Sequence, residues 1–359
     1  MRRRFSIYVE TISPNEVGDV IVNKLYEETF SLSNEELDYL ESLPQSSGEL
    51  VINGKLNLKK RFEMTIVNDC SVLGKVSVSL HLPTEKLLSR KKFGRNMAKI
   101  FHYQPADHIE QLVIPFISTP RGHNHYFHFI LHRFVALIYA LKKIPQAREA
   151  VVLIRRGIPA FQISAFNFLT KKYPRLIIRE ISSTEKIDCD HLLILEETIW
   201  QPIGNLAGGK IIQAVRDAYI SEYELTPPPK SRLLYISRKR QKQRLMLNEE
   251  QLIEHLEHLG FEIICPELLP HKAQVALFSA AKVVVATTGA ALTNLLFCQP
   301  ECNVIEIRPE TYDYPLFLGL CKQMSLNHYH FSGSATTGKD MFNVDIEKLC
   351  ELVRQVSTN

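Results

Sequence analysis

The sequence predicts an α/β protein whose C-terminal part is a doubly wound parallel sheet. Between about residues 230 and 310, short β-branched runs alternate with amphipathic helical segments without a break. Such alternation is typical of βαβ units. The expected strands are 233–237, 261–265, 282–286 and 303–307, and the expected helices are 248–260, 271–281 and 291–297.

The helix expected at 248–260 has the clearest end signals. Asn248 suits the N-cap, Glu249 and Glu250 suit the positive end of the helix dipole, and Gly260 suits the position after the last turn. Gln251 stands where a capping box would place it. Apolar residues recur at helical spacing between these ends, which predicts one buried face.

A second, less regular set of βαβ units is expected upstream. Apolar runs at 150–155, 175–181 and 191–197 alternate with helical segments at 123–142, 160–172 and 206–221. The three prolines of TPPPK (226–230) forbid a continuing helix, so we place the linker between two lobes there. Asn53-Gly54 lies between two strand-like runs and predicts a β-hairpin.

These signals divide the 359-residue chain into two Rossmann-like lobes with additions, in agreement with the usual size of domains. The expected parts are an accessory segment (1–100), a first lobe (101–226), a second lobe (230–335) and a C-terminal helix that packs back on the body (340–359).

Composition and charge describe an ordinary globular protein. The chain is 45% hydrophobic and 23% charged, and its net charge of +4 is too small for the whole molecule to act as a polyanion binder. Seven cysteines without paired spacing indicate reduced thiols. Glu10 precedes any apolar run and no long apolar stretch follows, which predicts a cytoplasmic protein with at most peripheral contact with the inner face of a membrane.

The candidate site lies where strands of the second lobe end, because ligands of open α/β sheets bind beyond the carboxyl ends of the strands. Thr287, Thr288 and Gly289 form a small turn that opens a helix and suits an anion. Arg238, which follows another strand, adds a planar fork for phosphate oxygens. Each feature alone fits a tight turn or a solvated basic loop, but their placement at one sheet edge favours a diphosphate site.

The stretch from YISRKR (235–240) to VIEIRPE (304–310) resembles the signature of glycosyltransferase family 61. A strand followed by Ser-Arg, Asn-Glu at a helix start, a Gln in the next helix, Gly-Ala-x-Leu-Thr-Asn and a strand ending near Glu carry the resemblance. A weaker similarity lies in HNHYFHFILHRFVAL (123–137).

The resemblance implies a GT-B-like architecture, with two Rossmann-like lobes and a cleft between them, and inverting sugar transfer without a metal or other cofactor. The partners implied are a nucleotide-sugar donor and a glycan or glycolipid acceptor. The positions that it carries over to the donor side are Arg238, Asn248, Glu249, Gln274, Gly289, Ala290, Asn294 and Glu306. Two positions depart from the family pattern: Thr288 replaces a His, and His132 replaces an acidic residue.

An inverting transfer needs a base that takes the proton of the acceptor hydroxyl. His128 and His132 are the leading candidates, because an imidazole accepts a proton near neutral pH and the two lie one helical turn apart. Asp107 is a weaker candidate. Each histidine could instead be an ordinary core or surface residue.

Other readings are less well supported. The histidines at 123, 125, 128 and 132 lack HExxH and a nearby carboxylate, so no metal site is expected. Asp188-Cys189-Asp190 resembles a metal-binding DxD but precedes the expected strand rather than following it. The basic loop 238–244 lacks an aromatic platform for nucleic acid.

The sequence therefore predicts an inverting, metal-independent glycosyltransferase of surface polysaccharide synthesis. A non-catalytic nucleotide-sugar or glycan-binding protein of the same fold is the alternative, and a nucleic-acid-binding protein is a third reading.

Overall fold

The computed structural model describes most of the chain. The described residues are 11–12, 16, 18–41, 51–52, 55–73, 78–81, 86–88, 107–117, 125–182, 184–195, 209–312, 315–336 and 341–358. The chain divides into two compact units, the first formed by 1–25 and 61–197 and the second by 26–60 and 198–359.

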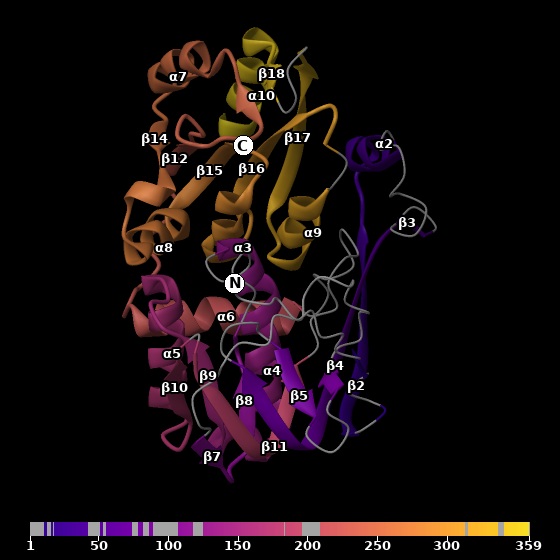
Figure 1. Cartoon of the computed structure of the whole chain (residues 1–359). Helices are drawn as coiled ribbons and strands as arrows, with labels where there is room; N and C mark the ends of the chain where they lie inside the picture. Colours follow the sequence, from indigo (N-terminus) through magenta and orange to yellow (C-terminus); the bar gives the residue numbers. More distant parts are fainter. Residues whose placement is uncertain are drawn as a thin grey trace, which may run out of the picture. The chain divides into compact units, whose positions relative to one another are not determined.

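A parallel sheet forms the centre of the second unit (Figure 1). Its strands are β12 (Arg232–Ile236), β14 (Glu262–Ile264), β15 (Ala281–Thr287), β16 (Asn303–Pro309) and β17 (Asn327–Ala335). They pair in the order β14-β12-β15-β16-β17, the order of a flavodoxin-like doubly wound fold. The parallel, doubly wound sheet expected there is confirmed, and its topological switch point lies between β12 and β15.

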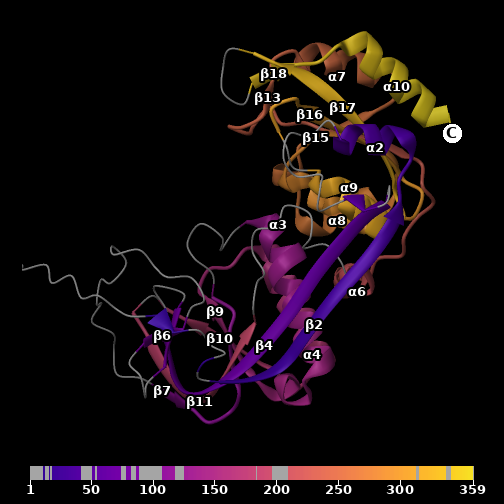
Figure 2. The same cartoon turned by 90° about the vertical axis from the view of Figure 1, so that its right-hand side faces the viewer.

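Helices cover both faces of this sheet. The elements are α6 (Gly209–Glu222), α7 (Glu249–His258), η5 (Pro266–Leu268), α8 (His271–Ser279), η6 (Ala290–Phe297), α9 (Leu316–Gln323) and α10 (Ile346–Thr358). Figure 2 shows α7 and α10 on one side and α8 and α9 on the other. Leu252 of α7 and Val353 of α10 share a core with Val285 and Ile305 of the central strands. The edge of the sheet is extended by β18 (Met341–Asn343) and β13 (Leu245–Met246).

The first unit contains a second set of parallel strands. These are β7 (Asp107–Ile109), β8 (Val113–Pro115), β9 (Val151–Arg155), β10 (Ile177–Ile181) and β11 (Lys186–Leu195). The order β10-β9-β8-β11 is half of a Rossmann arrangement, with its switch point between β8 and β11. The helical elements that follow its strands are α3 (Tyr126–His128), η2 (Phe129–Phe134), α4 (Val135–Lys143), η3 (Pro145–Glu149) and α5 (Ala160–Lys172).

The N-terminal segment is not a separate layer. Its elements are β1 (Thr11–Ile12), β2 (Gly18–Ser31), α2 (Asn34–Glu41), β3 (Val51–Ile52), β4 (Lys55–Leu73), β5 (Val78–His81) and β6 (Lys86–Leu88). The pairing of Ile52 with Lys55 confirms the hairpin, although its two central residues lie outside the described ones. β4 runs antiparallel to β11, so the segment continues the first sheet, while 26–60 belongs to the second unit.

Several expected boundaries differ from those observed. The division of the chain falls at 197–198, because α6 packs on η6 of the second unit, whereas we expected it at the prolines of 226–230. The helix expected at 291–297 is a 3₁₀ helix, and the one at 123–142 contains a π-helical stretch. Asn248 stands at the N-cap position of α7, but its side chain makes no capping hydrogen bond.

Among the described helices, none is long and apolar enough to cross a membrane.

A buried histidine joins α6 to α8. His271 Nδ1 and the Tyr223 hydroxyl are hydrogen-bonded at 2.7 Å, and the rings of Tyr219 and Phe297 lie edge-on to the imidazole. Burial lowers the pKa of His271 from 6.5 to about 3. The folded protein therefore holds this side chain neutral in a packed aromatic cluster.

We expect His271→Gln to reduce the loss of stability in mild acid. Below pH 6.5 the unfolded chain binds a proton at His271 that the folded chain does not, so the stability present above pH 6.5 is lost as the pH falls toward 3. That contribution has a slope of up to about 1.4 kcal/mol per pH unit. Urea denaturation between pH 7 and pH 5 measures it. His258→Gln, on the exposed side of α7, is the matched control, and equal slopes for both variants would contradict the prediction.

Candidate functional site

The first candidate site lies in the second unit, at the carboxyl ends of β12, β15 and β16. Arg238 follows β12, Thr288 and Gly289 follow β15, and Arg308 lies near the end of β16. The switch point between β12 and β15 is where an open α/β sheet leaves room for a ligand. The topology therefore brings together the two motifs that the sequence placed at one sheet edge.

Arg238 is held against the turn after β15. Its side chain is 9% exposed, and its Nη1 and Nη2 donate to the carbonyl oxygens of Thr288 at 3.4 Å and Gln243 at 2.9 Å. A Cβ atom on Gly289 would overlap Arg238 Nη1. Gly289 has a φ of 166°, an extended conformation open to any residue, so a side chain here is opposed by the position of the Arg238 guanidinium and not by the backbone angles.

Glu249 fixes the loop that carries Arg238. Its Oε1 accepts hydrogen bonds from the backbone N–H of Arg238 at 2.8 Å and from the Tyr235 hydroxyl at 3.0 Å. The carboxylate is buried. The pKa of Tyr235 is raised mainly by the burial of its hydroxyl and further by this nearby carboxylate. Glu249 therefore joins the start of α7 to the end of β12 and sets the direction in which Arg238 leaves the strand.

The charge of Arg238 is compensated only in part, because the carboxylates of Glu249 and Glu267 oppose the effects of burial and of Arg244. Burial, and then the nearby Arg244, lower its pKa from 12.5 to about 10, so the guanidinium remains charged at neutral pH. Within the described part of the chain, Arg238 Nε, Arg244 Nε and Thr288 Oγ1 are buried without a hydrogen-bond partner. Buried polar atoms of this kind need an explanation, and an anionic ligand would supply both the charge and the acceptors.

Arg308 joins Arg238 and Arg244 in a positive cluster, and the sequence did not predict a role for it. Its Cζ lies 5.4 Å from the centre of the Tyr312 ring, and Arg244 Cζ lies 5.0 Å from the same ring. Arg308 Nη2 also donates to the Tyr312 carbonyl oxygen. The position of Arg308 at the carboxyl end of a predicted strand was the available signal, since that edge was already the expected site.

Three of the predicted donor residues are engaged with the scaffold. Gln274 Nε2 donates to the carbonyl oxygens of Pro266 at 2.8 Å and Leu269 at 3.1 Å, and its Oε1 accepts from Asn294 Nδ2 at 3.0 Å. The Asn248 side chain makes two hydrogen bonds to the backbone of Val344. These amides hold the loop before α8 and the start of α7. A ligand contact by any of them would come in addition to these hydrogen bonds within the protein.

Glu306 is a fully buried carboxylate on β16. Its Oε2 lies 3.0 Å from His328 Nε2, whereas its Oε1 is buried without a hydrogen-bond partner in the described residues. Thr287, the last residue of β15, is also buried, and Ala290 begins η6. Arg308 follows Glu306 by two residues on the same strand, so both side chains lie on the same face of the sheet.

The second candidate site lies in the first unit, where the helix after β8 begins. The Nδ1 atoms of His128 and His132 are 3.3 Å apart, and His125 and His128 have ring centres 4.4 Å apart. The stretch Phe129–Phe134 is π-helical, a feature often found at functional sites. Burial lowers the pKa of His128, which favours its neutral, proton-accepting form. The structure therefore brings the two predicted base candidates together.

The acidic candidates of the first unit are not part of the histidine pair. Asp107 begins β7, at the amino-terminal edge of the sheet, and pairs with Arg179. Asp188 and Asp190 lie within β11 rather than before it, where they contact Ser71 and His108. In the part of the chain that is described, no group of three or more His, Cys, Asp or Glu side chains could hold a metal ion. His123 lies outside the described residues.

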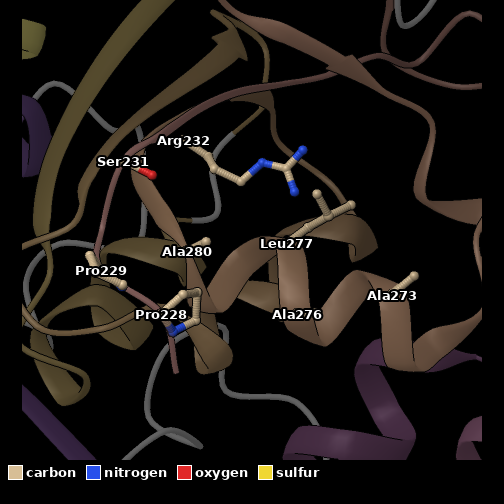
Figure 3. A pocket seen from close by; sticks show the side chains of 8 residues that line it. All are labelled: Pro228, Pro229, Ser231, Arg232, Ala273, Ala276, Leu277 and Ala280. Atoms are coloured by element: carbon tan, nitrogen blue, oxygen red, sulfur yellow. The ribbon is translucent and has the colours of Figure 1, made fainter. Parts of the chain in front are cut away.

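A separate hollow of about 630 Å³ lies in the second unit (Figure 3). Its lining consists of Pro228, Pro229, Ser231, Arg232, Ala273, Ala276, Leu277 and Ala280. Arg232 begins β12, so the hollow lies at the amino ends of the strands, opposite Arg238. The Arg232 guanidinium is already paired with Glu262, at 2.6 Å from Nε to Oε1. The lining therefore offers little polar chemistry for a charged ligand.

The comparisons with known proteins identify a family. A family model described as Glycosyltransferase 61 matches residues 101–305, more than half of the chain. None of the curated proteins matches the chain. The matched residues include Arg238, Gly289 and the helix with His128 and His132, whereas Arg308 lies beyond them.

We expect Gly289→Ala to destabilise the protein through Arg238. In the wild-type background the added methyl group displaces the guanidinium, and such overpacking costs about 1–3 kcal/mol. In the Arg238→Ala background the methyl group has room and the cost disappears. Urea denaturation of both single variants and of the double variant forms the cycle that measures the coupling. Additive losses would show that the two residues do not constrain each other.

Proposed function

The chain belongs to glycosyltransferase family 61, and we propose that it transfers a sugar from a nucleotide-sugar donor to a glycan or glycolipid acceptor with inversion. The resemblance detected in the sequence is thereby confirmed at the level of the family. The finer proposal includes a GT-B arrangement with two lobes and a cleft, no metal requirement, a cytoplasmic location and a part in surface polysaccharide synthesis.

One observation carries the donor side of the proposal: Arg238 and the Thr288-Gly289 turn meet at the switch point of a doubly wound sheet. An anion there would meet the Arg238 guanidinium, the Thr288 hydroxyl and the N–H groups at the start of η6. We therefore assign the donor diphosphate to Arg238, Thr288, Gly289 and Ala290. The leaving diphosphate gains negative charge during transfer, and fixed positive groups stabilise that charge.

The remaining donor-side residues act as supports in this proposal. Asn248, Gln274 and Asn294 shape the loops around the diphosphate through the hydrogen bonds described above. Thr287 ends β15, the strand that leads into the Thr288-Gly289 turn. Glu306 adds a buried carboxylate on the neighbouring strand β16. Arg308 adds a buried positive charge to the cluster, which attracts an anion more strongly in a region of low dielectric.

We propose that His128 and His132 together supply the catalytic base. A neutral imidazole carries one N–H, so in the neutral pair one Nδ1 donates to the other. The donating ring then keeps an unprotonated Nε2, which can take the proton of the acceptor hydroxyl. The other ring has Nε2–H, which can donate a hydrogen bond to the acceptor.

A non-catalytic nucleotide-sugar or glycan-binding protein is the second candidate. The observations that favour it are Thr288 in place of the family's His and His132 in place of an acidic residue. Such a protein would keep the anion site of the second unit, bind a nucleotide and show no turnover. Binding and turnover therefore separate the two candidates.

We expect the purified protein to bind one nucleoside diphosphate or nucleotide sugar with micromolar affinity in a calorimetric titration of a panel. Chelator should leave this affinity unchanged, and Arg238→Ala should weaken it by at least about 100-fold, because a charged hydrogen-bonding partner of a phosphate is lost. Arg232→Ala, at the opposite edge of the sheet, is the matched control. Absence of binding to every member of the panel would overturn the donor site.

We expect His128→Ala and His132→Ala each to lower kcat by about 100- to 10,000-fold, the usual contribution of a general base, while the donor affinity is unchanged. Since burial lowers the pKa of His128, the wild-type rate should fall with acid only below pH 6.5. Initial rates from pH 5 to pH 8 with the identified donor measure both effects. His255→Ala, on the exposed side of α7, should behave as wild type. Wild-type rates in both variants would exclude the pair as the base.

A further inference from the structure

The second unit contains an N-terminal helix that lies outside the residues matched by the family. This helix, α2, belongs to the segment 26–60 and contacts β17. Ser33 and Glu36 form a capping box at its start, with the Ser33 N–H donating to Glu36 Oε2 at 2.8 Å and the Glu36 N–H to Ser33 Oγ at 3.2 Å. The same Glu36 oxygen pairs with Lys322 Nζ at 2.7 Å. The helix is thus tied to α9 by a largely buried ion pair.

Tyr39 of α2 lies against the end of the positive cluster. Its side chain is 5% exposed, and its ring is stacked on His330 with centres 4.1 Å apart. Arg308 Cζ lies 5.0 Å from the Tyr39 ring centre and 5.4 Å from that of Tyr312. Two tyrosine rings therefore contact one buried guanidinium, and one of the rings comes from the N-terminal segment.

We propose that Tyr39 is a positioning residue of the donor site, which holds Arg308 so that its charge acts on the bound diphosphate. This inference rests on the proposed donor site. It assigns the helix Asn34–Glu41 to the binding machinery, although the sequence placed it in an accessory segment.

The physical reason is that a flexible cation needs a fixed environment to act at one place. Arg308 is 2% exposed, and an arginine side chain has many rotamers to lose when it is ordered. A tyrosine face attracts a guanidinium, most strongly when water is excluded. Without the ring, the guanidinium could move into the space left by Tyr39, away from the carboxyl end of β15. The Tyr39 ring, rather than its hydroxyl, is the part that this role requires.

The test is calorimetric titration of the full chain with inorganic pyrophosphate and with the best nucleoside diphosphate of the panel. We expect Tyr39→Met to weaken both affinities roughly tenfold, which corresponds to the loss of one buried cation–π contact. Tyr39→Phe keeps the ring and should bind as the wild type does. Tyr329→Met is the matched control, because Tyr329 lies on the same strand as His330 but packs into the core on the other face.

A double-mutant cycle separates positioning from a merely structural role. In the Arg308→Met background, Tyr39→Met should cause no further loss of affinity. Arg308→Lys tests the same contact if Tyr39→Met does not fold, since lysine keeps the charge but not the flat stacking surface, and it should also lose about tenfold. Thermal unfolding of each variant shows how much stability has been lost.

Three results with the variants would overturn the inference. Unchanged affinity in a folded Tyr39→Met protein, an equal loss in Tyr329→Met, or additive losses in the cycle would each show that Tyr39 does not act through Arg308. If the wild type binds neither pyrophosphate nor any nucleotide, the donor site itself is wrong and the inference fails with it. If the wild type binds pyrophosphate or a nucleotide and Tyr39→Met binds it equally well, the donor site stands and the role of Tyr39 does not.

Discussion

The architecture of the candidate donor site depends on the burial of one charged side chain, Arg238. A guanidinium that is 9% exposed needs acceptors, and the carbonyl oxygens of Thr288 and Gln243 supply them for Nη1 and Nη2, whereas Nε has none in the described residues. The absence of a side chain at Gly289 leaves the space that it occupies. Glu249 fixes the backbone from which it projects. The ends of the strands, the turn and the start of α7 are therefore constrained by contacts with a single residue.

The parts of this arrangement that follow from local patterns could be predicted from the sequence. The alternation of strands and helices after residue 230 fixed the parallel sheet, and the rule for strand ends then placed Arg238 and Gly289 at one edge. The role of Glu249 could not be derived in this way, because its hydrogen bonds to Tyr235 and Arg238 depend on how α7 packs on β12. Side-chain partners of this kind are set by tertiary packing, so they cannot be predicted from local patterns in a single sequence.

The N-terminal segment was the least predictable part for a related reason. β2 and β4 are long strands whose register depends on distant partners, and the pairing of β4 with β11 joins residues more than 100 positions apart. Such non-local pairings leave no local sequence signal beyond the hairpin at Asn53-Gly54. The contact of Tyr39 with Arg308 is equally remote in sequence, and only the folded chain brings the two together.

The helix expected at 123–142 also differs from the observed one. Periodicity predicted an ordinary α-helix there, whereas the stretch between His128 and Val135 is π-helical.

Each of the two departures from the family pattern has an electrostatic consequence in the proposed mechanism. A carboxylate base would carry a negative charge in a reaction whose leaving group is also anionic, and like charges raise the energy of that state. A neutral histidine pair removes this repulsion, at the cost of losing its function when it is protonated in acid. At the donor side, Thr288 offers a hydroxyl without charge, so the stabilisation of the leaving diphosphate falls on arginines, which stay protonated throughout the physiological range. In the proposed mechanism, the arginines of the positive cluster, Arg238, Arg244 and Arg308, supply the charge that an ionisable histidine at position 288 would otherwise add.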